Sequence, residues 1–277
     1  DEQHLNEFCL NDLNIAPVEC TALFKYFYYT KNLRMVRIRK CNVENFVALK
    51  LAELLKKDNQ IVGLELENCR ISVEDAKHII SALGNKNCKV TQLAMSGNML
   101  AVECVQYLSD TLTNENCNLV ELAMRDRLTD ECAKYLCDAL RNDNCKLTQL
   151  DISDNRLTYK GAKYLSDVLE SRSCKLARLN IGNNDLENLG AKYLSEGLEN
   201  DNCTLTELFI NGNKLTDEGA KCLCDALVSH ECKLVKLHLT DNKLTDAGVK
   251  YLSDALMSFN CKLVQLDITS NKFTDMA

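Results

Sequence analysis

Apolar residues recur along this chain in a unit that combines two spacings. In the unit that begins at Cys145, Leu150 and Ile152 alternate with variable residues, which is the period of a strand with one buried face. Farther along the same unit, Ala162 and Leu165 follow the spacing of one face of a helix. Each unit is therefore predicted to be a strand followed by a helix.

The unit repeats at a nearly constant length. Seven cysteines mark it at steps of 28 or 29 residues, namely Cys88, Cys117, Cys145, Cys174, Cys203, Cys232 and Cys261. Between them the chain follows the leucine-rich-repeat pattern L-x-x-L-x-L-x-x-N/C-x-L, and the same register extends back toward the first residues. The sequence predicts about ten repeats of 28 or 29 residues, stacked as a solenoid in which each repeat packs against its neighbours.

The predicted fold class is α/β. Strands of a parallel sheet lie about 4.8 Å apart, whereas packed helices need roughly 8–10 Å, so stacked repeats are expected to curve. The expectation is a horseshoe with the parallel sheet on its concave face and the helices on its convex face. Threonine and acidic residues, as at Thr216-Asp217 and Thr245-Asp246, are expected to cap the starts of the helices.

An asparagine follows most of the predicted strands. These residues, Asn98, Asn155, Asn184, Asn213, Asn242 and Asn271, are expected to bind backbone groups left unpaired where each strand turns outward. In the unit around residues 124–128 the spacing is one residue short, and Asp126 stands where the asparagine is expected. We therefore expect a local irregularity there.

Residues 1–277 are predicted to form a single leucine-rich-repeat domain, because no Pro/Gly/Ser-rich linker interrupts them and 46% apolar residues suffice for a continuous core. Residues 1–60 carry divergent repeats, and residues 61–277 carry regular ones. The last repeat stops where its helix should begin, which indicates a truncated or unusually capped end.

The amino-acid composition argues against several classes of function. A net charge of −7 argues against nucleic acid as a partner, and no apolar stretch reaches the roughly 18 residues of a membrane span. The repeat explains most of the sixteen cysteines, so the seven periodic ones are expected to be buried free thiols, and a cytoplasmic location is expected. The four histidines are scattered and no nucleophile motif or zinc spacing is present, so neither an enzyme nor a cofactor or metal site is predicted.

The repeats are similar to those of a known family. The runs GAKYLSDVL at 161–169 and CKLTQLDISDN at 145–155 resemble ribonuclease-inhibitor-type leucine-rich repeats, most of all those in the C-terminal repeat domain of NOD-like receptors. The resemblance covers the whole chain. It implies a protein-binding or ligand-recognition module that senses ligands, or restrains a preceding nucleotide-binding domain, in an intracellular innate-immune receptor. No P-loop occurs in this chain, so such a domain would lie outside it.

Two other functions stay open. The first is a stand-alone inhibitor or scaffold that wraps a target enzyme, as ribonuclease inhibitor does, although ladder cysteines occur here only at Cys41 and Cys69. The second is a GTPase-activating regulator of the Ran type, which would need a catalytic arginine. Four arginines are available, and nothing singles one of them out: Arg34, Arg37, Arg39 and Arg70.

The variable positions of the predicted strands are the candidate binding residues, because they differ between repeats while the helices repeat almost verbatim. They are expected to hold a protein partner or pathogen-derived ligand on the concave face: Arg37, Arg39, Lys40, Glu65, Glu67, Arg125, Asp151, Arg178, Asn180, Phe209, His238 and Asp267. Phe209 beside Arg178 and His238 has the composition of an interface anchor. The basic strand around Arg37 either pairs with the acidic strand around Glu65 or docks an acidic partner.

The first predicted helix is rich in aromatic residues, namely Phe24, Tyr26, Phe27, Tyr28 and Tyr29. The repeat register assigns Leu23 and Phe27 to the core. The remaining aromatics either close the N-terminal end of the solenoid or dock onto a preceding domain.

Overall fold

The computed structural model describes residues 6–12, 17–30, 32–43, 45–98, 100–125 and 127–274. The chain divides into two compact units, residues 1–126 with 143–147, and residues 127–142 with 148–277. The boundary at residues 126 and 127 coincides with the repeat that is one residue short. Asp126 itself lies outside the described residues. The single domain expected from the sequence stays a prediction, and each unit is described by itself.

The first unit alternates parallel strands with helices. Its elements are β1 (Glu7–Asn11), α1 (Pro17–Tyr29), β2 (Met35–Arg39), α2 (Asn45–Leu55), β3 (Gly63–Glu67), α3 (Val73–Leu83), β4 (Gln92–Ala94), α4 (Val102–Leu112) and β5 (Glu121–Ala123). The strands pair in sequence order, and Phe8, Val36, Leu64, Leu93 and Leu122 align across them. The predicted register of apolar residues is therefore confirmed.

The second unit repeats the same arrangement. Its elements are α5 (Asp130–Leu140), β6 (Gln149–Asp151), α6 (Tyr159–Leu169), β7 (Arg178–Asn180), α7 (Glu187–Leu198), β8 (Glu207–Phe209), α8 (Asp217–Leu227), β9 (Lys236–His238), α9 (Asp246–Leu256) and β10 (Gln265–Asp267). The central leucines of the strands, Leu150, Leu179, Leu208, Leu237 and Leu266, align in register. The predicted α/β leucine-rich-repeat solenoid, with one strand and one helix in each repeat, is confirmed.

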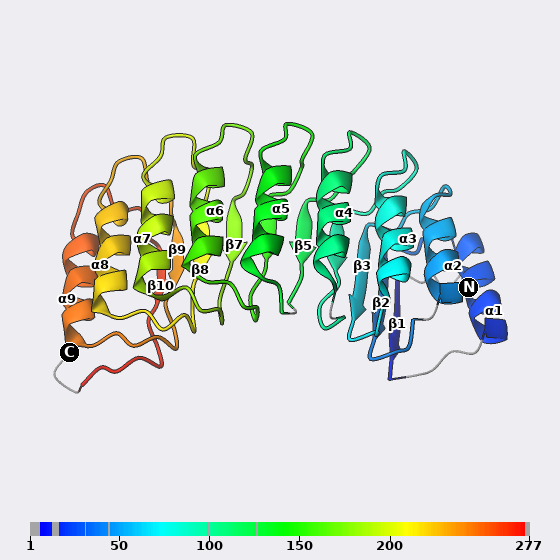
Figure 1. The fold of residues 1–277 in the computed structure, drawn as a ribbon, viewed down its shortest axis with the longest axis horizontal. Helices are drawn as coiled ribbons and strands as arrows, with labels where there is room; N and C mark the ends of the chain where they lie inside the picture. Colours follow the sequence, from blue (N-terminus) through cyan, green and yellow to red (C-terminus); the bar gives the residue numbers. More distant parts are fainter. Residues whose placement is uncertain are drawn as a thin grey trace. The chain divides into compact units, whose positions relative to one another are not determined.

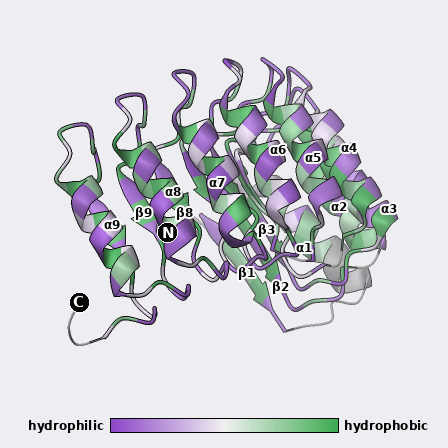
Figure 2. Cartoon of the chain, turned by 60° about the vertical axis from the view of Figure 1, so that its left-hand side comes forward, coloured by the Kyte–Doolittle hydropathy of each residue, from purple (hydrophilic) through white to green (hydrophobic). Residues whose placement is uncertain are grey.

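Alternation along each strand decides which side chains enter the core. Leu208 is fully buried, whereas its neighbours Glu207 and Phe209 are half-buried. Successive side chains of a strand point to opposite faces, so the leucines face the helices, and the flanking residues form a helix-free sheet face. Within each unit the helices lie on one side of the strands (Figure 1). Each helix of the second unit carries hydrophobic and hydrophilic bands (Figure 2), as a helix with one buried stripe should.

The predicted asparagine ladder is confirmed, and Asn213 illustrates it. Its side chain is fully buried, and its Oδ1 accepts a hydrogen bond from the backbone N–H of Leu186 in the preceding repeat (3.3 Å). Its Nδ2 donates to the backbone oxygens of Ile181 in the preceding repeat (2.9 Å) and of Ile210 in its own (3.2 Å). Each ladder asparagine thus ties two repeats together while satisfying buried backbone groups.

The expected local cap is present at Thr245, whose hydroxyl accepts the N–H of Ala247 (3.4 Å), but acidic residues at the helix starts also bond across repeats. The carboxylate of Asp217, in the first turn of α8, accepts hydrogen bonds from the backbone N–H (2.7 Å) and hydroxyl (2.7 Å) of Thr245, just before α9. Asp130 holds Thr158 in the same way. Thr216 itself makes no side-chain cap, and its N–H bonds to Asn188 Oδ1 at 2.9 Å instead.

The cysteines behave as small apolar residues. Of the seven periodic cysteines, Cys261 is half-buried and the other six are buried. All described cysteines are free thiols. Burial raises the pKa of the Cys203 thiol to about 11, so the protonated form prevails at neutral pH.

The first helix differs from its expected orientation. Phe24 and Phe27 are buried at 6% and 3% exposure, whereas Leu23, which was assigned to the core, is only half-buried. Phe27 packs edge-on against Phe8 of β1, with ring centroids 4.7 Å apart, so the large rings take the place of the usual leucine. Tyr29 is 69% exposed. The side chain of Tyr28 lies outside the described residues.

Candidate binding surface on the helix-free sheet face

The twelve predicted binding residues fall into two groups of six. The first group lies in the first unit: Arg37, Arg39, Lys40, Glu65, Glu67 and Arg125. The second group lies in the second unit: Asp151, Arg178, Asn180, Phe209, His238 and Asp267. Each group is a candidate surface of its own unit.

Ion pairs link five of the six residues of the first group, and the sixth, Lys40, is exposed. Arg37 Nε lies 2.9 Å from Glu65 Oε1, and Arg39 contacts both Glu65 and Glu67. Arg37 also pairs with Glu7 of β1. Arg125 Nη2 lies 3.7 Å from Glu67 Oε1. Of the two alternatives left open by the sequence, pairing between neighbouring strands is the one observed.

This pairing changes the titration of the network. Burial acts to raise the pKa of Glu65, but hydrogen bonds from Arg37 and Arg39 outweigh it, so the pKa is lowered. The hydrogen bond to Glu65 in turn raises the pKa of Arg39. A partner that drew these arginines away would leave a half-buried carboxylate behind, so this network is a poor docking site for an acidic ligand.

The second group contains a stack of three side chains from three adjacent strands, Arg178 of β7, Phe209 of β8 and His238 of β9. The guanidinium carbon of Arg178 lies 4.5 Å from the centroid of the Phe209 ring. The ring of His238 stacks on the same phenyl ring at 4.4 Å with an interplanar angle of 21°. Because β7 and β9 flank β8 on opposite sides, the phenyl ring is sandwiched. Phe209 is thus a half-buried centre of a stack rather than a freely exposed anchor.

Glu207 links the stack to Lys236 through two ion pairs. Glu207 Oε2 lies 3.5 Å from Arg178 Nη1, and Glu207 Oε1 lies 2.7 Å from Lys236 Nζ. The Arg178 side chain, 47% exposed, is therefore held both by the phenyl ring and by a carboxylate. Such a guanidinium loses little conformational freedom when it binds a carboxylate or carbonyl group of a partner.

Three residues of the second group have a local structural role. Asp151, Asn180 and Asp267 each accept a hydrogen bond from the backbone N–H two residues farther on, at 3.0, 3.1 and 3.1 Å. This geometry holds the turn that follows each strand. It also lowers the pKa of Asp267, through the backbone and hydroxyl hydrogen bonds from Thr269. These side chains shape the surface around the stack more than they add free binding groups.

No described residues cluster as three or more potential metal ligands. None of the helices in the described ranges is long and apolar enough to cross a membrane.

Asp267 Oδ2 lies 3.8 Å from His238 Nδ1, which places a carboxylate beside the ring. The chemistry that this surface offers is therefore cationic, aromatic and hydrogen-bonding contact.

Sequence reasoning identified the three members of the stack but omitted Glu207 and Lys236 from the candidate residues. A usable signal was present, because residues 29 positions apart face each other in neighbouring strands, and this spacing separates Arg178, Glu207 and Lys236. Glu207 pairs with both Arg178 and Lys236 because of side-chain conformations that the spacing does not specify.

This chain is similar to a known family and to solved structures. Five segments, residues 143–166, 172–195, 201–224, 230–253 and 259–275, match the family described as Leucine Rich repeat. No curated protein sequence matches the chain. Among solved structures, an internalin from Listeria monocytogenes is similar at 15% identity and a TM-score of 0.41, over 95% of this chain and 86% of that protein. TLR13, in a complex with ssRNA13, is similar at 16% identity and a TM-score of 0.51, over 90% of this chain but only 37% of that protein.

Proposed function

Because the fold is a leucine-rich-repeat solenoid, a scaffold for recognition, we propose that this chain binds a protein partner through the helix-free face of its second unit. The observation that carries the proposal is the stack of Arg178, Phe209 and His238. Arginine and aromatic residues dominate the energetics of protein interfaces, and those at the centre of a well-packed patch contribute most. A stack that is already ordered before binding costs little entropy to use.

A protein suits this surface better than a nucleic acid. The strand residues around the stack mix cations, Arg178 and Lys236, with carboxylates, Asp151, Glu207 and Asp267. A phosphate backbone requires several unpaired cations in a row, and the whole chain carries a net charge of −7. The RNA in the TLR13 complex is a ligand of TLR13 and carries no argument for this chain. A partner with both charges and a planar or apolar side chain for the stack fits the face described here.

We further propose that the chain is the sensing or autoinhibitory repeat domain of an intracellular NOD-like receptor. Support comes from the resemblance of runs such as GAKYLSDVL at 161–169 to the repeats of that family. The free cysteines fit a reducing compartment such as the cytoplasm. In this proposal a pathogen-derived or host ligand, or a preceding nucleotide-binding domain, is the partner that covers the stack.

Affinity capture from cell extract tests the binding proposal. The bait is the intact chain, compared with a variant carrying Phe209→Ala and Arg178→Ala. A matched control carries Tyr193→Ala and Lys163→Ala, because Lys163 Nζ lies 5.6 Å from the Tyr193 ring centroid in a similar cation–aromatic pair on the helices. Circular dichroism establishes that all three proteins fold.

The proposal predicts that a protein retained by the intact chain is lost by the stack variant and kept by the helix variant. Reconstitution with the purified partner should then show at least a tenfold loss of affinity, since a hot-spot pair contributes about 2 kcal/mol or more. Equal retention by all three baits would contradict the proposed surface. A partner that is a nucleotide-binding domain or a microbial product would support the receptor assignment, and an enzyme as partner would contradict it.

A further inference from the structure

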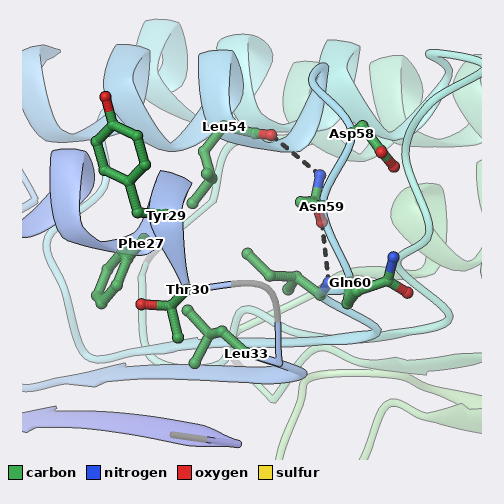
Figure 3. A pocket seen from close by; sticks show the side chains of 9 residues that line it. Phe27, Tyr29, Thr30, Leu33, Leu54, Asp58, Asn59 and Gln60 are labelled. Atoms are coloured by element: carbon green, nitrogen blue, oxygen red, sulfur yellow. Dashed lines mark hydrogen bonds between the residues drawn. The ribbon is translucent and has the colours of Figure 1, made fainter. Parts of the chain in front are cut away.

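Two hollows lie between α1 and α2 in the first unit, and Tyr29 and Leu54 line both of them. The first has a volume of about 400 Å³ and is lined by Phe27, Tyr29, Thr30, Leu33, Leu54, Asp58, Asn59, Gln60 and Ile61 (Figure 3). The second has a volume of about 300 Å³ and is lined by Phe24, Lys25, Tyr29, Lys50, Glu53, Leu54 and Lys57. We call the second hollow the lysine groove.

Two polar side chains that line the first hollow, Asn59 and Asp58, already have structural partners. Asn59 donates to the backbone oxygens of Leu54 (3.0 Å) and Lys57 (2.8 Å) and accepts from the N–H of Ile61 (2.9 Å). Asp58 lies 3.2 Å from Lys89 Nζ. Figure 3 shows Asn59 between Leu54 and Gln60, where its bonds close the turn after α2. The Asn59 and Asp58 side chains of the first hollow therefore serve the local structure.

The lysine groove has a different electrostatic character. Three lysines line it against one carboxylate, Glu53, which pairs with Lys50 at 2.8 Å. The pKa of Glu53 is lowered by the hydrogen bond from Lys50 and, farther out, by Lys57 and Lys56. The groove thus carries an excess of positive charge in a chain whose net charge is −7. Such a local excess attracts an anionic partner and repels a basic one.

The floor and one wall of this groove are apolar. Phe24 and Leu54 are buried at 6% and 4% exposure, and Tyr29, 69% exposed, stands between the groove and the first hollow. Lys50 Nζ lies 5.7 Å from the ring centroid of Phe46, so this lysine is positioned over an aromatic ring. A ligand that fills the groove meets positive charge at the rim and apolar atoms beneath.

We infer that the lysine groove is a docking site for an acidic peptide segment of a protein partner, with an apolar side chain seated between Phe24, Leu54 and Tyr29. Charge complementarity selects carboxylates, and the concave volume suits one or two side chains. A nucleic-acid backbone requires a longer row of cations than one groove supplies. A lipid bilayer requires a broad apolar face rather than a recess. The site differs from the stack on the sheet face, so it adds a second contact to the proposed function.

A displayed library of random short peptides tests the inference. The library is panned on the full chain after depletion on a variant carrying Lys25→Glu and Lys57→Glu. A charge-matched control carries Lys160→Glu and Lys250→Glu, two exposed lysines of the second unit. Enriched peptides are synthesised with a fluorophore, and their dissociation constants are measured by anisotropy, beside a fluorescent oligonucleotide and anionic phospholipid vesicles.

The expected result is a set of peptides in which Asp or Glu flanks an apolar residue. They should bind the full chain at least tenfold more tightly than the Lys25→Glu, Lys57→Glu variant, and should bind the control variant as well as the full chain. Absence of peptides after depletion, enriched peptides without acidic residues, or equal binding to both variants would overturn the inference. Tighter groove-dependent binding of the oligonucleotide or the vesicles would also overturn it. A Phe209→Ala variant should bind the peptide as well as the full chain does. Failure of the sheet-face proposal can therefore be distinguished from failure of the groove proposal.

Discussion

Replacement of Asn213 by alanine tests the physical account of the ladder. Asn213 is fully buried, and its Oδ1 accepts the backbone N–H of Leu186, a residue that is itself fully buried. In the Asn213→Ala variant this N–H has no acceptor and no access to water, which costs about 1–3 kcal/mol. The carbonyl oxygens of Ile181 and Ile210 lose one hydrogen bond each but keep those from Asn184 and Asn242.

The sum is a predicted loss of about 2–4 kcal/mol in the free energy of unfolding, with the orphaned N–H as the largest part. The Asn271→Ala variant is the matched control, because Asn271 accepts the N–H of Leu244 at 3.0 Å but is only half-buried. Water can replace part of its role, so its loss should be no more than about half as large. Urea unfolding followed by circular dichroism measures both. A change below about 0.5 kcal/mol for Asn213→Ala, or equal losses in both variants, would refute the reasoning.

Three further predictions concern charge, thiols and cooperativity. The pKa of Glu65 is lower in the folded than in the unfolded chain, so the ionised carboxylate stabilises the fold above the unfolded-state pKa, and this stabilisation is lost as the pH falls through the folded-state pKa. The free energy of unfolding should therefore fall more steeply in acid for the native chain than for the Glu65→Gln variant. Parallel curves for the two proteins would contradict this. Exposed Cys9 should alkylate rapidly in the native state and buried Cys203 only on unfolding, as mass spectrometry would show, and equal rates would be inconsistent with the burial described. If residues 1–277 are one domain, Cys88 and Cys203 should become reactive at the same urea concentration, whereas two midpoints would indicate two domains.

The repeat architecture could be predicted because the same pattern of buried and exposed positions recurs in every repeat. A leucine such as Leu208 must face the helices in every repeat, and the strand period then places Glu207 and Phe209 on the opposite face. The role of Asn213 was likewise accessible, because buried backbone groups require partners and few polar side chains are buried. Both inferences depend only on spacing within and between repeats.

What could not be predicted depends on side-chain packing between elements. Leu23 was assigned to the core by register, but the divergent first repeat buries Phe24 beside Phe27 instead. Asp217 was expected to cap its own helix, yet it bonds Thr245, a residue 28 positions away. Local capping rules do not describe a bond between adjacent repeats.

The candidate site shows the same limit. The sheet register brought Arg178, Phe209 and His238 together, but the sandwiching of the phenyl ring depends on conformations that no sequence rule specifies. The lysine groove had no sequence signal, because Lys25 and Lys57 come from α1 and from the turn after α2 and meet only when these helices pack.

Site-specific photo-crosslinking tests the proposed binding surface most directly. A benzoylphenylalanine residue is placed at position 209 on the sheet face or, as a control, at position 193 on α7, and each protein is irradiated in cell extract. The account predicts a protein adduct from position 209 that is absent from position 193 and disappears when Arg178→Ala is added. An adduct that forms only from position 193, or one with RNA in place of protein, would contradict it.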